Sequence, residues 1–221
     1  MALDVDVREA YRYLGLRGRA PDAATERAVD EALGALRDEI DPKRVARRFD
    51  LARPEDGVLE IEGLRVQSRA LCKHLDGCGE VYLMAATLGI GPDRLIARAQ
   101  AAGAMARAMA LQAAAAAMIE ALCDAVNADL AAEALQRGQY LRPRFSPGYG
   151  DFPLSCQPGL FRLLDVQRRI GVTLTDSCMM IPTKSVTAVV GLCDRAATHS
   201  DRCAACERRD CAFRDGRKDK P

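Results

Sequence analysis

The chain of 221 residues contains no tryptophan, and aromatic residues make up only 5% of it. Hydrophobic residues nevertheless make up 49% of the sequence. Alanine and leucine must therefore supply most of the core, which favours closely packed helices. A chain of this length forms one domain, or one domain with a small appendage, and can bury roughly two-thirds of its unfolded surface.

A strong excess of one charge is also missing. The formal net charge at pH 7 is +1. Domains that bind nucleic acid usually show a marked basic excess, so the charge argues against a nucleic-acid partner. The short run of Arg and Lys near the C-terminus is mixed with acidic residues, which is typical of a solvated tail.

Long apolar runs are missing as well. The most apolar segment, which is rich in alanine, is interrupted by Arg107, Gln112 and Glu120, so no run reaches the length of a membrane span. The N-terminus carries Asp4 and Asp6 where a secretory signal would have an apolar stretch. We therefore expect a cytoplasmic protein with no membrane partner.

Cysteine, in contrast, is abundant: there are nine, an odd number that cannot all pair. In the cytoplasm, thiols indicate metal or redox chemistry more than disulfides. Cys203 and Cys206 have the spacing that binds one metal, and Cys211 can close such a site. The fourth ligand would be Cys193, His199 or a partner's residue, and zinc or an iron–sulfur cluster would fit. The alternative is a flexible tail with plain thiols.

A second group, Cys72, His74 and Cys78, also has a spacing that suggests a metal site. We favour the simpler interpretation, in which a thiol faces the core and the histidine lies at the end of a helix.

Periodicity predicts an α+β fold. Apolar residues at helical spacing predict helices over 6–14, 23–49 (interrupted near Pro42), 68–75 and 158–170. Alternation predicts a hairpin of residues 59–61 and 64–66, and the near-continuous apolar run 81–88 predicts a central strand covered on both faces. Residues 172–175 and 185–190 are rich in β-branched residues, which predicts two further strands that pair antiparallel.

The segment 103–136 is rich in alanine and predicts one helix, on the order of 50 Å long at 1.5 Å per residue. We therefore expect an antiparallel β-sheet flanked by helices, including this long one. Polar residues at helical spacing, Glu120, Asp124 and Asn127, lie opposite its apolar stripe. An exposed face is the simplest explanation of them. We expect this domain to span residues 1–195, with a cysteine-containing tail over 196–221.

The most informative stretch is residues 142–151, here called the arginine loop, with the sequence Arg-Pro-Arg-Phe-Ser-Pro-Gly-Tyr-Gly-Asp. Pro147 fixes its own φ and Gly148 can take a positive φ, which predicts a tight turn. Glycine also lets a ligand approach the main chain closely. Arg144 offers a planar fork of donors to a carboxylate, and the ring of Tyr149 can attract a cation.

The loop therefore suits a small zwitterion that carries a further positive centre. A surface turn that only joins two elements is the alternative. A sharper hypothesis for the long helix also follows: Glu120 or Asp124 points toward Arg144 and receives the ammonium group of the ligand.

Residues 144–149 resemble the Arg-x-Ala/Ser-Pro-Gly-Tyr signature of the activation domain of cobalamin-dependent methionine synthase. The likeness spans residues 139–192, about a quarter of the chain, and continues through 160–166, 171–177, 180–182 and 185–186. The acid that the family often carries six residues before the loop arginine falls here on Gly138. The cysteine tail has no counterpart in the classical multidomain enzyme.

The resemblance implies that the chain holds S-adenosylmethionine above the corrin of a partner, where a reductant gives one electron and the donor's methyl group restores methylcobalamin from cob(II)alamin. Arg144 would grip the donor's carboxylate. The family uses carboxylates around the bound ligand, which agrees with Glu120 or Asp124 as the partner of the ammonium group. The backbone of Ser146, Pro147 and Gly148 would contact its polar groups, with Tyr149 near the sulfonium or the edge of the corrin.

The implied partner is a cobalamin-binding methionine synthase that lacks its own activation domain, with an electron donor such as a flavodoxin. The chain would be a component of that methyltransferase rather than a complete enzyme. Two alternatives remain open. One is a reductive activator of another corrinoid protein, with a metal or iron–sulfur cluster in the tail. The other is a metal-stabilised binding module with no methyl-donor site.

Overall fold

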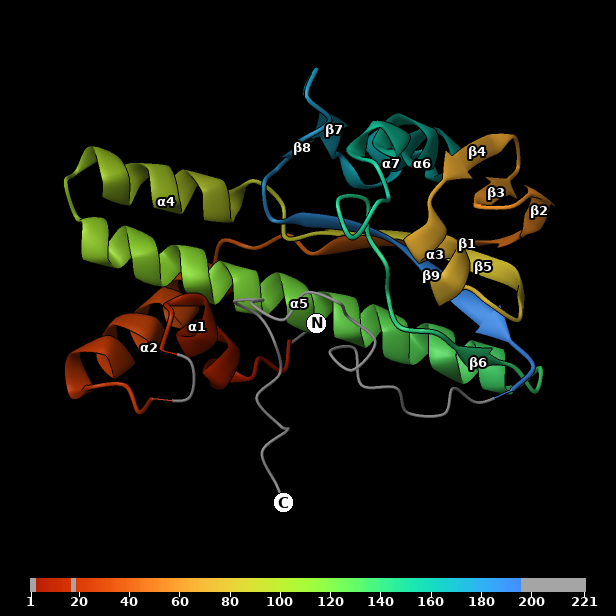
Figure 1. The fold of residues 1–221 in the computed structure, drawn as a ribbon. Helices are drawn as coiled ribbons and strands as arrows, with labels where there is room; N and C mark the ends of the chain where they lie inside the picture. The colour runs from red at the N-terminus through yellow and green to blue at the C-terminus, as the bar shows by residue number, and fades with distance from the viewer. Residues whose placement is uncertain (1–2, 17–18, 196–221) are drawn as a thin grey trace.

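The computed structural model describes residues 3–16 and 19–195, and its centre is a four-stranded antiparallel sheet. The strand order is β1 (Lys43–Asp50), β5 (Cys78–Thr87), β9 (Ser185–Cys193) and β6 (Tyr140–Leu141). Helices pack on the sheet (Figure 1), so the predicted α+β class is confirmed.

The remaining elements frame this sheet. The helices are α1 (Val7–Tyr13), α2 (Ala23–Arg37), α3 (Arg69–His74), α4 (Gly91–Ala101), α5 (Met105–Leu135), α6 (Gln157–Leu164) and α7 (Val166–Ile170), with a 3-10 turn, η1 (Leu154–Cys156). The strands β2 (Ala52–Glu55), β3 (Val58–Ile61) and β4 (Leu64–Gln67) form a small antiparallel sheet, and β7 (Thr173–Leu174) pairs with β8 (Met180–Ile181).

Two apolar cores lie on opposite faces of the main sheet. Successive side chains of a strand point to opposite faces, and β5 feeds both cores: Met84 packs with the helices α1, α2, α4 and α5, whereas Leu83 packs with α3, α6, α7 and the small sheet. In Figure 1, α5 runs along the sheet with α4 on one side and α1 and α2 on the other. The predicted central strand, covered on both faces, is confirmed.

Helix α5 forms the spine of the first core. Alanines such as Ala114 and Ala115 are completely buried along it, so neighbouring helices can approach its backbone closely. By length and composition α5 could cross a membrane, but 61% of its most apolar window is buried inside the structure. That is the pattern of a buried core helix.

The predicted helix over residues 23–49 is wrong in its second half. Helix α2 ends at Arg37, and the strand β1 follows after Pro42. The buried side chains of β1, Val45 and Phe49, are four residues apart, a spacing that also fits one face of a helix. Charged residues on both sides of them hid the alternation of a strand.

The predicted pairing of residues 172–175 with 185–190 is also wrong. Thr173 and Leu174 pair with β8, whereas β9 pairs with β5 on one side and β6 on the other. Almost every residue of β9 is buried, so this strand requires a neighbour on each side and a covered position inside the sheet.

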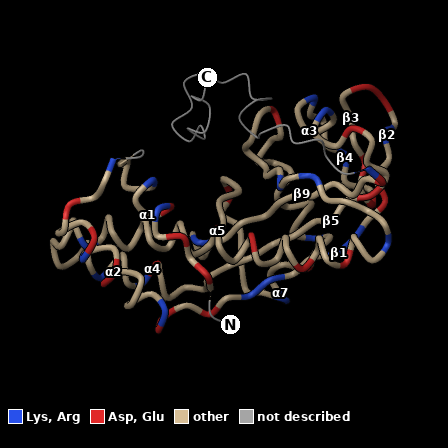
Figure 2. The backbone as a smooth tube through the Cα atoms, turned by 90° about the horizontal axis from the view of Figure 1, so that it is seen from below, with Lys and Arg blue, Asp and Glu red and all other residues tan. Residues whose placement is uncertain are grey.

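Acidic and basic residues are interspersed along the described chain (Figure 2). This distribution agrees with the small net charge.

Candidate functional site

The arginine loop follows β6 and lies along the edge of β9. The backbone N–H of Arg142 donates to the carbonyl of Gly191 at 2.9 Å, and Phe145 and Val189 exchange two backbone hydrogen bonds of 2.9 Å. The first half of the loop thus continues the sheet beyond the two residues of β6. The position of Arg144 is therefore fixed by main-chain bonds on both sides of it.

The second half of the loop contains the predicted tight turn. The N–H of Tyr149 donates to the carbonyl of Ser146 at 3.1 Å, and Gly148 has a φ of +93°. The N–H of Gly148 donates to the carbonyl of Phe152 at 2.7 Å. A positive φ at the third position of such a turn favours glycine, so the prediction for Gly148 is confirmed.

Arg144 lies between two carboxylates of α5. Its two terminal nitrogens donate to Glu120 at 3.0 Å and to Asp124 at 2.7 Å. The side chain of Arg144 is only 10% exposed, whereas those of Glu120 and Asp124 are 36% and 69% exposed. The polar residues of α5 therefore face the loop, and this part of the helix is not simply a solvated surface.

The local charge balance of the group is negative. Arg144 supplies one positive charge, and Glu120 and Asp124 supply two negative charges. Burial acts to lower the pKa of the guanidinium, but the nearby thiol and the two carboxylates outweigh it, so this pKa is raised. A small molecule with a carboxylate and a net positive charge would match both sides of the group.

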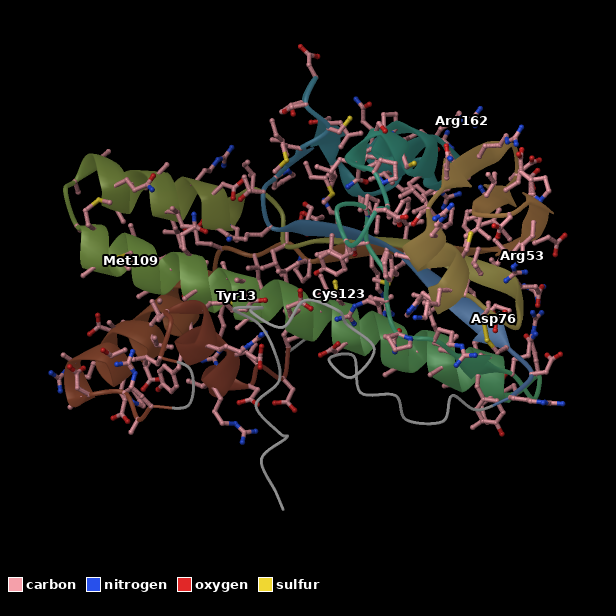
Figure 3. The ribbon with its side chains drawn as sticks, viewed as in Figure 1. Tyr13, Arg53, Asp76, Met109, Cys123 and Arg162 are labelled. Carbon is pink, nitrogen blue, oxygen red and sulfur yellow. A yellow bond between two sulfur atoms is a disulfide. The ribbon has the colours of Figure 1, made fainter. Side chains whose placement is uncertain are left out.

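Cys123 lies on α5 next to these carboxylates and is fully buried (Figure 3). Burial raises the pKa of its thiol to about 12, although Arg144 acts to lower it. The thiol is therefore neutral at neutral pH and unsuited to act as a nucleophile.

Helix α1 contributes to the same region, which the sequence analysis did not anticipate. Tyr13 ends this helix beside α5 (Figure 3). Burial raises the pKa of Tyr13 to about 12, and the charge of Glu120 adds to this shift. Tyr149 is 59% exposed and so remains available to a ligand. The sequence held no signal for Tyr13, because its proximity depends on how α1 packs against α5.

An aromatic cluster supports the loop from its other side. The ring centroid of Phe145 lies 5.0 Å from that of His74, 6.1 Å from that of Tyr149 and 6.4 Å from that of Phe152. Phe152 is 1% exposed. The loop therefore has its own apolar anchor in the second core.

The cysteines behave differently from the prediction of metal ligands. Cys78 and Cys193 form a disulfide between β5 and β9, so Cys193 is not available as the fourth ligand of a tail site. His74 lies at the end of α3, as the simpler interpretation expected. Among residues 3–16 and 19–195, no group of three or more His, Cys, Asp or Glu is arranged to hold a metal.

Cys203, Cys206, Cys211 and His199 lie outside the residues that the structure describes. The proposal of a metal site in the tail therefore stays a prediction.

A separate cavity of about 480 Å³ lies away from the loop, between β1, α6 and the turn of the small sheet. Its lining mixes Arg47, Arg48 and Arg162 with Asp50, Glu62 and Glu80, and it contains no residue of the arginine loop. We assign no function to it.

Comparison with known proteins gives the family. The sequence model described as "Vitamin B12 dependent methionine synthase, activation domain" matches residues 76–201. A solved structure described as "Crystal Structure of the MetH Reactivation Domain bound to AdoHcy" has a TM-score of 0.62 and 16% sequence identity, and the alignment covers 84% of this chain and 74% of that one. At this identity the likeness shows the fold. No curated protein sequence matches the chain.

The family match covers more than half of the chain and contains β5, α5, the arginine loop and β9. Within this segment, β5 and β9 are the two middle strands of the central sheet, and α5 and the arginine loop place Arg144 between Glu120 and Asp124. The chain therefore belongs to the vitamin B12-dependent methionine synthase activation domain family.

Proposed function

We propose that this protein binds S-adenosylmethionine at the arginine loop and presents its methyl group to the corrinoid cofactor of a partner methionine synthase. The observation that carries the proposal is the group of Arg144, Glu120 and Asp124, held beside a glycine turn within the family-matched segment. The related reactivation domain was crystallised with AdoHcy, the molecule that S-adenosylmethionine becomes when it loses its methyl group.

The ligand's amino-acid end would exchange partners with the protein's ion pairs. Asp124 is the more exposed partner of Arg144, so the ligand carboxylate would replace it on the guanidinium. The ammonium group would then bind Glu120 and the released Asp124. After this exchange every charged group of the site and of the ligand's amino-acid end still has a partner of opposite charge, which makes the exchange energetically reasonable in a half-buried site.

The turn would hold the rest of the ligand. The backbone at Ser146, Pro147 and Gly148 contributes carbonyl and N–H groups without a side chain at the third position, and the exposed ring of Tyr149 offers its face to the sulfonium. S-adenosylmethionine supplies an activated methyl group when bound, and the cobalamin of the partner accepts it. The residues of this chain bind and orient the donor.

The wider setting of the reaction belongs to the same proposal. The partner would be a cobalamin-binding methionine synthase that lacks its own activation domain, and the electron would come from a donor such as a flavodoxin. The protein would work in the cytoplasm as a component of the methyltransferase. The domain would end near residue 195, with the cysteine tail as a separate appendage that holds zinc or an iron–sulfur cluster.

Calorimetric titration with S-adenosylmethionine tests the proposal. Loss of a charged contact costs about 1.5–3 kcal/mol, so Arg144→Ala should bind roughly ten- to hundredfold more weakly than the wild type. Arg168→Ala is the matched control, because the side chain of Arg168 is 81% exposed and forms an ion pair with Asp165, away from the arginine loop. Equal affinities of the wild type and Arg144→Ala would contradict the assignment.

A further inference from the structure

Helix α3 lies beside the arginine loop and bonds to both ends of it. At the end of the loop, the Asp151 carboxylate accepts three hydrogen bonds: from the Ser68 hydroxyl at 2.5 Å, the Arg69 N–H at 2.8 Å and the Ala70 N–H at 3.0 Å. These donors form the start of α3. The Ser68 hydrogen bond lowers the pKa of Asp151, so its carboxylate is charged at neutral pH.

At the start of the loop, His74 makes the corresponding contact from the last residue of α3. Its Nε2 lies 2.7 Å from the carbonyl oxygen of Pro143. A carbonyl can only accept, so Nε2 carries the proton. Proline has no N–H, so this carbonyl is its only backbone group that can form a hydrogen bond. The imidazole also packs against the ring of Phe145.

A close backbone approach joins the two segments between these bonds. A Cβ placed on Gly150 would lie 2.8 Å from the Cβ of Ala70, closer than two such carbons can pack. Gly150 is therefore pressed against the first turn of α3. Leu71 and Leu75, within and just after that helix, are fully buried, so α3 is fixed to the second core and offers a rigid support.

We propose that α3 is a rigid support that holds the arginine loop at both ends, and that Asp151 and His74 are positioning residues for ligand binding. This inference rests on the proposed function only for the identity of the ligand. Neither residue needs to touch the ligand. Each acts by keeping Arg144 and the turn at Gly148 in the geometry that binding requires.

The hydrogen bonds argue for this role over simple stabilisation of α3. The helix already has its own cap, because the Ser68 hydroxyl accepts the N–H of Leu71 at 3.0 Å. Asp151 adds bonds that join residues 81 to 83 positions apart in the chain. Their main effect is thus to tie the loop to α3.

The test compares ligand affinity and loop rigidity in paired variants of the full chain. Asp151→Asn replaces one acceptor oxygen with a donor and should weaken S-adenosylmethionine binding about tenfold, since small misplacements of binding groups are costly. Asp22→Asn is the control, because Asp22 caps α2 through the N–H of Thr25 at 2.8 Å and lies outside the loop. Its affinity should equal that of the wild type.

For His74, the pair is His74→Phe and His74→Gln. Phenylalanine keeps a ring against Phe145 but has no donor for Pro143, whereas glutamine keeps a donor. We expect weaker binding in His74→Phe and substantial recovery in His74→Gln. In the ligand-free protein, amide hydrogen exchange at Gly148 and Tyr149 should be about tenfold faster in Asp151→Asn and His74→Phe than in the wild type.

The inference is overturned if Asp151→Asn and His74→Phe leave both affinity and amide exchange unchanged. It is also overturned if Asp22→Asn lowers affinity as much as Asp151→Asn does, because a general loss of stability would then explain both. If the wild type does not bind S-adenosylmethionine at all, the proposed function fails, and the exchange rates of the ligand-free variants still decide whether α3 positions the loop.

Discussion

At the scale of single residues, the backbone conformation at position 148, rather than a lack of space for a side chain, explains why glycine is needed there. Its φ is +93°, and within the described part of the chain a Cβ there would meet only Leu154, at an ordinary contact distance of 3.5 Å. A branched side chain strongly disfavours this φ. We therefore expect Gly148→Val to rearrange the turn and abolish binding of S-adenosylmethionine while the fold remains, as measured by calorimetry beside circular dichroism.

The control for Gly148 is another glycine with a positive φ. Gly103, between α4 and α5, has a φ of +70°, and a Cβ placed on it would have no neighbouring atom within 4 Å among the residues that the structure describes. Gly103→Ala should lower the melting temperature slightly and leave affinity unchanged, because the same kind of backbone strain then arises away from the loop. Normal binding by Gly148→Val would show that Gly148 is only a connecting residue.

The predictions for single residues succeeded where the structure depends on neighbouring residues in the chain. The turn at Gly148 follows from Pro147 and Gly148 alone, so the sequence was sufficient. The bonds of Asp151 to α3 and the disulfide of Cys193 join positions 81 or more residues apart. Such contacts depend on the packed fold, and no short pattern in a single sequence encodes them.

At the scale of elements, α5 depends on small side chains. Ala114 is fully buried, whereas Ala128 on the same helix is exposed. Ala114→Leu should force its neighbours apart and lower the free energy of unfolding by about 1–3 kcal/mol. Ala128→Leu should change it by less than about 0.5 kcal/mol. Urea denaturation of both variants measures the difference, and equal stabilities would contradict close packing at Ala114.

The elements that were predicted well have one clear period. The long helix, the hairpin of β3 and β4, and the buried strand β5 all follow from spacing and composition. Strand β1 was misassigned because its buried pair, Val45 and Phe49, fits a helical spacing equally well. Its pairing with β5 shows that the segment is a strand. The sequence of one segment alone does not reveal its pairing partner.

At the scale of the whole molecule, we expect the tail and the domain to be independent. Cys203, Cys206 and Cys211 should hold one metal or cluster per chain, with His199 or a partner's residue as the fourth ligand, now that Cys193 is bonded to Cys78. Elemental analysis of anaerobically purified protein should show the metal in the wild type and not in Cys203→Ser/Cys206→Ser.

The affinity of that double variant for S-adenosylmethionine should equal the wild-type value, because the arginine loop is anchored to β9, α3 and α5. Substoichiometric metal in both proteins would mean that the tail cysteines are plain thiols. A large loss of affinity in the double variant would show that the tail contributes to the site.

For the overall architecture, the sequence predicts the fold class correctly but not which strands pair in the main sheet. The α+β class and individual elements such as α5 and β5 could be inferred from the sequence. The neighbours of β9 could not, because its partner β5 precedes it by about a hundred residues and α5 and the arginine loop lie between them. Because segment 172–175 is close in the chain, it was predicted to pair with β9. The burial of β9 instead requires a position inside the main sheet, between β5 and β6.

The arginine loop also covers part of the edge of β9, which affects whether that edge can pair with another chain. β9 is an apolar strand, and β6 pairs with only its last two residues. The bonds of Arg142 and Phe145 cover the next stretch of its edge. An uncovered apolar edge is a template for pairing with another chain. The loop thus closes a strand edge that could otherwise pair with another chain, so a substitution that detaches the loop would expose the apolar edge of β9 as well as move Arg144.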